Sequence, residues 1–265
     1  MRADLYLTQN GHADSRTLAR KLIEDGAVTL DGRVLKKASE EIGPGTHTVV
    51  VSATADTRYV GRGGLKLEAA LQAFPIDPAG CVAADVGAST GGFTDCLLQK
   101  GAARVYAVDA GHGQLHPKLL ADPRVRSAEG VNARNLTPAL LMQAEADWRV
   151  AHPDGESEPF AGTVDGIVMD VSFISQTLLH PALASVLKEG GWMVSLIKPQ
   201  FELTRSALNK QGIVKQEKDR KAAVERVLAS AAGCGFEAVS VIPSPIEGGD
   251  GNREFLAYFV KSKKA

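Results

Sequence analysis

The sequence predicts an α/β fold in which a doubly wound sheet follows a smaller N-terminal module. Short apolar runs alternate with helical segments from residue 81 to the end of the chain, as in successive βαβ units. A glycine-rich turn at residues 85–93 joins one apolar run to a helix, the position where such folds bind nucleotide-like ligands. The small, polar residues 53–57 are typical of a linker. We therefore expect two domains, at residues 1–60 and 61–265.

The first expected domain has the pattern of a small α+β unit. Leucine and isoleucine side chains recur at helical spacing over two short segments, and Ser15 is well placed to cap the second helix. Gly26 ends that helix, and Asp31 and Gly32 form a strong hairpin signal. Strands are expected around this turn and further along, at residues 27–30, 33–35 and 48–51.

Basic residues gather on this domain although its charges balance, with eight Lys or Arg and eight Asp or Glu over residues 1–60. The second helix carries Arg16, Arg20 and Lys21, and the hairpin carries Arg33. A solvated surface would explain these charges. The whole chain has a net charge of −1, so bulk charge predicts no polyanion partner and any nucleic-acid surface must be local.

The turn from Asp85 to Phe93 predicts a site for a cationic ligand that bears an amino group. A dinucleotide fingerprint has the spacing G-x-G-x-x-G, whereas here three residues separate Gly87 from the glycine pair that follows. A pyrophosphate disfavours a nearby carboxylate, but Asp85 suits the methionine part of S-adenosylmethionine. Glycine lets the backbone approach such a ligand closely. The expected contacts are Asp85, Gly87, Ala88, Ser89, Thr90, Gly91, Gly92 and Phe93.

A second acid supports this interpretation of the turn. Asp109 ends the next expected strand, residues 104–109, where a carboxylate can accept hydrogen bonds from a ribose diol. The alternative is a tight turn between a strand and a helix that holds no ligand.

The remaining strands and helices continue the alternation. A helix over residues 65–74 ends before Pro75. A helix over residues 175–188 is expected to stop at the pair Gly190–Gly191, and residues 148–163 have the composition of a surface loop. Further elements are strands at 125–128, 166–170, 192–197, 238–242 and 255–260 and a helix at 218–232.

Composition excludes several classes of protein. A hydrophobic content of 44% is sufficient for a large core. Cys81, Cys96 and Cys234 form no close pair, which opposes a disulfide framework or a thiolate zinc site and fits a reducing cytoplasm. No cluster of His or Cys offers a metal site, and His112 and His116 are expected to be loop or surface residues.

Nothing in the sequence predicts contact with a membrane. Residues 1–14 contain no apolar h-region of a secretory signal. The most apolar stretch, residues 192–197, is far too short to span a bilayer. We therefore expect a cytoplasmic protein.

Four polar side chains occupy positions where the pattern predicts the edge of the core or a cleft, namely Lys66, Asp170, Lys198 and Glu254. Lys198 directly follows an apolar strand, where a lysine without a partner would carry a large desolvation cost. Asp170 also ends a strand, so both side chains should face the ligand cleft. Two lysines and two carboxylates are neutral together, which makes a partly buried cluster tolerable. The alternative is two ordinary ion pairs at strand ends.

A recognisable pattern in the N-terminal domain is formed by residues 2–4, 15–16, 23–28 and 31–33. With this pattern the domain resembles the S-four-type RNA-binding domain of a ribosomal protein and of pseudouridine synthases. The resemblance implies that the two-helix face with Arg16 and Arg20 contacts structured RNA, and Lys21 and Arg33 are further candidates. Recognition of folded RNA through shape and phosphate contacts requires no large net charge.

Five motifs of the second domain lie at residues 61–67, 85–95, 168–175, 197–202 and 251–254. They resemble the TlyA family of FtsJ-like ribosomal-RNA ribose methyltransferases, some members of which are named haemolysins. The likeness extends over essentially the whole chain. It implies a Rossmann-like methyltransferase sheet of seven strands with the last one antiparallel, and S-adenosylmethionine as the cofactor.

The resemblance also implies the roles of individual residues. The Lys-Asp-Lys-Glu tetrad of the family falls on Lys66, Asp170, Lys198 and Glu254. Glu247 is a rival for the last place, but Glu254 lies in the matching motif. Asp170 is also expected at the cofactor. The family methylates cytidine 2′-hydroxyls in small- and large-subunit rRNA, so ribosomal subunits are the expected partners.

The residue types fit this chemistry. Methyl transfer to a ribose hydroxyl is an in-line displacement in which positioning supplies much of the rate. Lys198 can stabilise the developing alkoxide, and it can act as the base where desolvation or Lys66 favours its neutral amine. Asp170 and Glu254 would orient the lysines, and no metal is required.

Two other functions stay open at this point. A pore-forming haemolysin would need an amphipathic or apolar membrane segment, and the sequence contains none. A non-catalytic RNA-binding factor of ribosome assembly would require the four polar residues to be incidental.

Overall fold

The computed structural model of the chain describes residues 1–13, 15–52, 58–155, 158–248 and 251–263. Internal contacts divide the chain into two units, Met1–Arg58 and Tyr59–Ala265. The linker expected at residues 53–57 lies outside the described residues.

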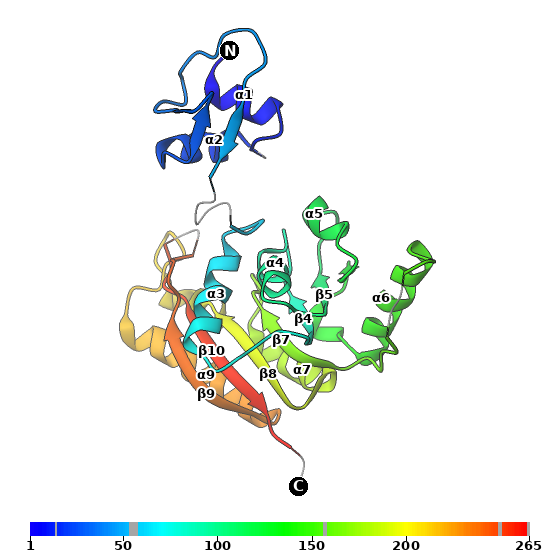
Figure 1. Cartoon of the computed structure of the whole chain (residues 1–265). Helices are drawn as coiled ribbons and strands as arrows, with labels where there is room; N and C mark the ends of the chain where they lie inside the picture. The colour runs from blue at the N-terminus through cyan, green and yellow to red at the C-terminus, as the bar shows by residue number, and fades with distance from the viewer. Residues whose placement is uncertain (14, 53–57, 156–157, 249–250, 264–265) are drawn as a thin grey trace. The chain divides into compact units, whose positions relative to one another are not determined.

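The first unit consists of two helices packed on a three-stranded antiparallel sheet (Figure 1). The helices are α1 (Ala3–Gln9) and α2 (Arg16–Glu24), and the strands, in the order β2-β1-β3, are β1 (Val28–Leu30), β2 (Arg33–Val34) and β3 (Val49–Val51). Leu7, Leu22 and Val28 are buried in their common core. The Ser15 hydroxyl accepts a hydrogen bond from the Leu18 amide at 3.2 Å, so the predicted helix cap is confirmed.

The second unit is built around one seven-stranded sheet with the order β6-β5-β4-β7-β8-β10-β9 (Figure 1). Neighbouring strands from β6 to β8 are parallel, and β10 runs antiparallel to both β8 and β9. The predicted seven-stranded α/β sheet with an antiparallel last strand is therefore confirmed. The strands are β4 (Val82–Val86), β5 (Arg104–Asp109), β6 (Val125–Glu129), β7 (Val164–Met169), β8 (Leu187–Ile197), β9 (Phe236–Pro243) and β10 (Phe255–Lys261).

Helices cover both faces of this sheet, and each face has its own core. One core includes residues of α3, α4 and α5, and the other includes residues of α6, α7 and α9. In β5, Val105 and Ala107 belong to the first core, whereas Tyr106 and Val108 belong to the second. Burial on both faces explains why the central strands, such as β5 and β7, are mostly apolar. The helices are α3 (Gly63–Ala73), α4 (Gly92–Gln99), α5 (Pro117–Leu120), α6 (Pro138–Ala151), α7 (His180–Val186), α8 (Pro199–Glu202) and α9 (Glu217–Gly233).

The order of the strands creates a switch point at β4. From β4 the chain continues to β5 and β6 on one side, and it then crosses to β7 and β8 on the other side. Ligands of doubly wound folds bind outside the carboxyl ends of the strands at such a point. The glycine-rich turn at residues 85–93 lies at this point in the second unit.

The helix expected over residues 175–188 is shorter in the structure. A 3₁₀ turn (Gln176–Leu178) comes first, and α7 follows it and ends at Val186. Leu187 begins β8 by pairing with Val164 of β7, so the glycine pair expected to end the helix lies inside this strand. Pairing with a neighbouring strand, which local sequence patterns do not report, decides this boundary.

The surface loop expected over residues 148–163 begins later than predicted. Helix α6 continues to Ala151, and Trp148 is only 9% exposed, with its ring centroid 3.5 Å from Cζ of the Arg126 guanidinium. Residues 156–157 of this stretch lie outside the described residues.

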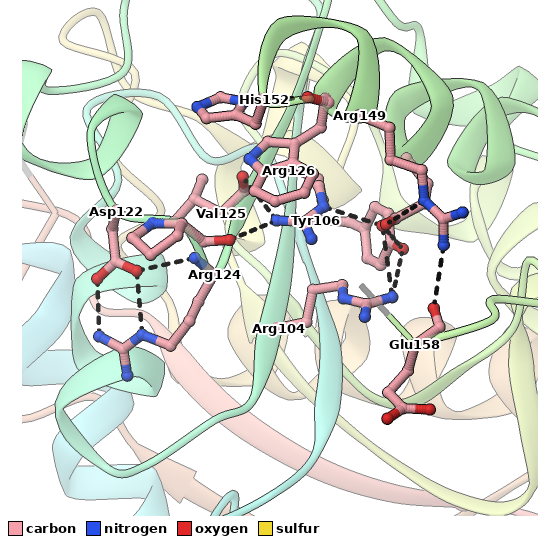
Figure 2. Close-up of polar contacts among 12 residues, drawn as sticks. Arg104, Tyr106, Asp122, Arg124, Val125, Arg126, Arg149, His152 and Glu158 are labelled. Carbon is pink, nitrogen blue, oxygen red and sulfur yellow. Dashed lines mark hydrogen bonds and ion pairs between the residues drawn. The ribbon is translucent and has the colours of Figure 1, made fainter. Parts of the chain in front are cut away.

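A buried charge cluster fastens α6 to β5 and β6 (Figure 2). The Glu145 carboxylate accepts hydrogen bonds from Arg126 Nε at 2.9 Å and from the Tyr106 hydroxyl at 2.7 Å. Arg104 and Arg149 each approach it at 3.4 Å. Desolvation lowers the pKa of Arg126, and the hydrogen bond and negative charge of Glu145 act in the opposite direction. The Glu145 carboxylate therefore compensates positive charge that lies inside the protein.

We expect Glu145→Gln to lower the free energy of unfolding by about 3 kcal/mol or more, because it leaves the buried guanidinium groups without a counter-charge. Urea denaturation of the full chain measures this change. Glu225→Gln, at an exposed position of α9, is the matched control and should change stability by about 0.5 kcal/mol at most. Equal stability of the two variants would mean that the cluster contributes no net stabilisation.

Candidate active site

The turn after β4 adopts a backbone conformation that requires glycine at two positions. Gly87 and Gly91 have φ values of +84° and +95°. A Cβ atom on Gly87 would lie 2.5 Å from the carbonyl oxygen of Asp170, and one on Gly91 would lie 2.1 Å from the Leu119 side chain. The positive φ and the lack of space both exclude other residues.

Two adjoining cavities open along this turn. The larger has a volume of about 510 Å³ and is lined by residues that include Asp109 and Phe173. The smaller has a volume of about 240 Å³ and reaches from the start of α3 to Asp85 and Lys198. The residues common to both are Gly87, Ser89, Asp170 and Ser172.

Most of the turn residues predicted to contact a cofactor line these cavities. The smaller cavity is bounded by Asp85, Gly87, Ala88, Ser89, Thr90, Gly92 and Phe93. Gly91 lines neither of the two; it faces the side chains of Leu115 and Leu119. Close packing, and not contact with either cavity, explains the glycine at position 91.

Asp85 is buried inside β4 and holds the first turn of α4. Its Oδ2 atom accepts hydrogen bonds from the Thr94 amide at 2.8 Å and from the Thr94 hydroxyl at 2.7 Å. Burial raises the pKa of this carboxyl to about 7. The second oxygen, Oδ1, has no hydrogen-bond partner among the described residues. A buried acceptor of this kind fits a ligand that donates hydrogen bonds or carries positive charge.

Asp109 ends β5 and lines the larger cavity. Its two carboxylate oxygens accept hydrogen bonds from the amides of Ser89 and Gly111, each at 2.7 Å. These bonds fix the orientation of the carboxylate. Each oxygen keeps a second lone pair that a hydroxyl group in the cavity can use.

The four residues predicted to be catalytic form two close ion pairs. Lys198 Nζ lies 2.5 Å from Asp170 Oδ1, and Lys66 Nζ lies 2.5 Å from Glu254 Oε2. Lys66 and Glu254 are only 8% and 4% exposed, so each of these charges depends on its partner for compensation.

The register of the sheet brings three of the four residues to one edge. Ile197 and Phe255 are paired across β8 and β10, and Lys198 and Glu254 are the residues next to this pair. Asp170 follows β7, the strand on the other side of β8. The fourth residue reaches this edge from α3.

Two residues of the loop after β7 also belong to this site, although they were not among the predicted site residues. The Ser172 hydroxyl accepts a hydrogen bond from Lys198 Nζ at 2.8 Å. Phe173 is 93% exposed, lines the larger cavity and has a left-handed backbone with φ of +63°. Their signal in the sequence is their position, since the hydroxyl and the aromatic ring come two and three residues after Asp170, the acid that follows β7.

Glu202 binds the C-terminal end of the loop that follows β7. Its carboxylate is buried and accepts hydrogen bonds from Ser175 Oγ at 2.5 Å and from the Gln176 amide at 2.9 Å. Glu202 ends α8, the short helix that starts directly after Lys198. The loop therefore contacts the Lys198 segment at both ends, through Ser172 and through Glu202.

The first unit carries the residues predicted to bind RNA. Arg16 and Arg20, together with Arg2, donate to the fully buried carboxylate of Asp4 at distances of 3.0, 3.1 and 3.0 Å. The hydrogen bond from Arg2, with those from the other two guanidinium groups, holds the pKa of Asp4 well below its usual range. Three positive charges face one negative charge, and the arginine side chains are about half exposed. We name these residues the arginine cluster.

The other two predicted residues lie outside the arginine cluster as defined. Arg33 pairs with Glu40, so the structure holds it in a different contact. Lys21 is exposed on α2. Arg2 was not predicted as a site residue. It could have been found in the sequence as the first residue of the N-terminal pattern, two positions before Asp4.

Among the residues that the structure describes, no three His, Cys, Asp or Glu side chains are grouped to hold a metal ion. His116 caps α5, and its Nδ1 accepts a hydrogen bond from the Lys118 amide at 3.1 Å. No helix within the described ranges is long and apolar enough to cross a membrane.

Comparison with known proteins shows relatives over almost the whole chain. The family of FtsJ-like methyltransferases matches residues 59–261, and the S4 domain matches residues 1–47. The 16S/23S rRNA (cytidine-2'-O)-methyltransferase TlyA of Mycobacterium tuberculosis is 38% identical over 257 residues, which are 97% of this chain and 88% of that protein. Hemolysin A of Brachyspira hyodysenteriae is 37% identical over 260 residues, which are 98% of this chain and 100% of that protein.

Solved structures agree with these matches. The structure of a protein described as a hemolysin from Streptococcus thermophilus is 39% identical and has a TM-score of 0.69, over 100% of this chain and 89% of its own. An S-adenosylmethionine dependent methyltransferase from Listeria monocytogenes is 14% identical with a TM-score of 0.52, over 76% of this chain and 99% of its own, a likeness of fold alone. The chain belongs to the TlyA family of FtsJ-like methyltransferases that carry an N-terminal S4 domain.

Proposed function

We propose that the chain methylates the ribose 2′-hydroxyl of cytidine in ribosomal RNA, with S-adenosylmethionine as the methyl donor. The observation that carries the proposal is the position of Lys198 Nζ, which contacts Asp170 and Ser172 at the wall of the smaller cavity. Two relatives named as rRNA cytidine-2'-O-methyltransferases support the choice of nucleotide. Ribosomal subunits are then the partners, and the cytoplasm is the place of action.

The residues of the two cavities suit S-adenosylmethionine, which supplies a methyl group on a sulfonium centre. Asp109 lines the larger cavity, where its carboxylate can accept hydrogen bonds from ribose hydroxyls. Asp85 lines the smaller cavity, and its buried Oδ1 atom, which lacks a hydrogen-bond partner within the described part of the chain, suits the cationic methionine part. Gly87 lets the backbone of the turn pack against the Asp170 carbonyl, at the wall that the two cavities share.

We assign to Lys198 the stabilisation of the charge on the attacking oxygen. As the 2′-hydroxyl attacks the methyl carbon, a C–O bond forms and the C–S bond of the sulfonium breaks, so that a neutral thioether leaves. A neutral Lys198 amine would accept the hydroxyl proton, and the ammonium so formed would stabilise the negative charge that develops on the attacking oxygen. Asp170 and Ser172 fix the position of Nζ, while Lys66 compensates the carboxylate of Glu254.

We assign to Phe173 a stacking contact with the nucleobase of the target nucleotide. Its exposed ring stands at the wall of the larger cavity. An exposed aromatic ring offers a stacking surface to a base that has left its own stack. A tilted contact with Phe201, with 5.2 Å between ring centroids, supports the ring from one side.

Methyl transfer to purified ribosomal subunits tests the proposed function. Small and large subunits from cells that lack this gene are incubated separately with the full chain and labelled S-adenosylmethionine. Nuclease digestion and mass spectrometry then identify the modified nucleoside, and 2′-O-methylcytidine is expected. Label on a base, or no label on either subunit, contradicts the proposal.

Lys198→Ala should slow single-turnover methyl transfer by about a hundredfold or more, because it removes the charge that stabilises the alkoxide. Lys198→Arg should also fail, since a guanidinium group is wider and stays protonated near neutral pH. Calorimetry should show that both variants bind S-adenosylmethionine, because the turn at Gly87 is unchanged.

Lys188→Ala is the matched control for this prediction. It removes an exposed lysine, paired with Asp165, from the other end of β8, and it should transfer methyl groups at the wild-type rate. A Lys198→Ala variant as fast as this control would make the four polar residues structural. That outcome would favour a non-catalytic RNA-binding protein.

The affinity for S-adenosylmethionine should depend on pH through Asp85. Its pKa of about 7 means that the carboxyl is mostly protonated at pH 6 and mostly ionised at pH 8. A cationic ligand favours the ionised form, so wild-type affinity should rise about tenfold between these pH values. Asp85→Asn should lose this rise, because an amide does not titrate. Calorimetry at both pH values compares the two proteins. An identical pH dependence in both would contradict the assignment of Asp85 to the cationic part of S-adenosylmethionine.

Replacing Arg16, Arg20 and Lys21 by glutamine should weaken binding to ribosomal subunits and flatten its salt dependence. Each lost phosphate contact lowers the slope of log K against log[salt] by roughly 0.7 to 0.9. Glutamine is preferred to glutamate, because a second acid beside the buried Asp4 would destabilise the unit. Filter binding over a salt series measures the slope, and the affinity for S-adenosylmethionine serves as the control. An unchanged slope would remove the docking role of these residues.

A further inference from the structure

The second unit carries a basic segment that has no role in the chemistry described above. Residues 203–221, named here the basic arm, contain six Lys or Arg and two Asp or Glu, whereas the whole chain has a net charge of −1. The basic arm connects α8, which starts directly after Lys198, to the first turns of α9. Positive charge is therefore concentrated where the chain leaves the candidate active site.

The tip of the basic arm is a tight turn with its own hydrogen bonds. An antiparallel bridge closes the turn. Asn209 Oδ1 accepts hydrogen bonds from the amides of Gln211 and Ile213 at 2.9 and 2.8 Å. Lys210 is exposed at the tip. These hydrogen bonds fix the backbone conformation of the turn that carries Lys210.

A buried asparagine fastens this turn to the loop that carries the last residue of the tetrad. Asn252 is 2% exposed, accepts a hydrogen bond from the Val214 amide at 3.0 Å and donates one to the Gly212 carbonyl at 3.1 Å. Glu254 follows two residues later. Arg220 of α9 donates a further hydrogen bond to the Val214 carbonyl at 2.7 Å. The basic arm is thus fixed beside the tetrad.

The lysines of the basic arm are available to an anionic partner. Lys210 and Lys215 are exposed, and neither side chain has a hydrogen bond or an ion pair within the part of the chain that the structure describes. Arg220, in contrast, is paired with Glu217 at 2.7 Å. No large apolar side chain is exposed between residues 203 and 221, all of which are described. Point charges without an apolar patch suit phosphate groups better than the surface of a protein.

We propose that the basic arm binds the phosphate backbone of ribosomal RNA next to the nucleotide that is methylated. This inference rests on the proposed function, because it takes the same RNA as the partner. It gives the second unit an RNA contact of its own, in addition to the arginine cluster of the first unit. Phosphate contacts position a nucleic acid without reading its sequence, so the basic arm acts on affinity and not on the chemical step.

The double variant Lys210→Gln/Lys215→Gln tests the inference in methyl transfer to purified ribosomal subunits. Its KM for subunits should rise by roughly tenfold, while kcat and the affinity for S-adenosylmethionine stay at wild-type values. The slope of log(1/KM) against log[salt] should fall by roughly 1.4 to 1.8, as for two lost phosphate contacts.

The matched control is Lys188→Gln/Lys263→Gln, which removes the same charge where β8 begins and just after β10 ends. These strand ends lie at the edge of the sheet opposite the tetrad, because β10 is antiparallel to β8. The control should match the wild type in KM and in salt dependence.

Three outcomes overturn the inference. They are a wild-type salt slope in the arm variant, an equal fall of the slope in the control, and a fall in kcat with an unchanged KM. Failure of the wild-type protein to methylate any subunit would instead contradict the proposed function, so the two failures are distinguishable.

Discussion

The close approach of two backbone segments, at Gly87 and Asp170, is the constraint on which the candidate site depends. The Asp170 amide donates to the Val86 carbonyl at 3.0 Å, and the Asp170 carbonyl fills the space that a side chain at position 87 would need. This contact joins the turn after β4 to the end of β7, and both cavities are bounded by it. The wall of the cavities and the carboxylate that holds Lys198 are therefore positioned by one local packing arrangement.

Compensation of buried charge organises the two units in different ways. In the first unit, Asp4 gathers three guanidinium groups whose side chains are about half exposed, so their positive charge can still reach a partner. In the second unit, Glu145 gathers guanidinium groups of which those of Arg104 and Arg126 are almost fully enclosed. One buried carboxylate with several arginines thus leaves an exposed basic surface in the first case and forms an internal support in the second. The two clusters contain similar ion pairs, and they differ in how far their arginine side chains are exposed to solvent.

Local patterns were sufficient to predict the existence and order of the seven strands, because the central strands are mostly apolar. Most strand ends differ by one or two residues, and Asp85, predicted in the turn, lies inside β4. The position of Asp170 and Lys198 at one edge of the sheet was also predicted, since adjacent parallel strands end at one edge. Contacts between loops could not be predicted in this way. Lys198 donates a hydrogen bond to Ser172, and Ser175 donates one to Glu202. These pairs are 26 and 27 positions apart, and loop residues carry no periodic signal. The early end of α7 likewise depends on a partner strand.

The place of β10 has a consequence for how the site is completed during synthesis. β10 lies between β8 and β9 in the sheet, although both precede it in the chain. Glu254 directly precedes β10, so this carboxylate takes its place only when the last strand enters the sheet. Because a chain is made from its N-terminus, Lys66 is synthesised 188 residues before the carboxylate with which it pairs. The arginine cluster, which lies within residues 2–20, is therefore synthesised long before the four polar side chains of the candidate site can be brought together.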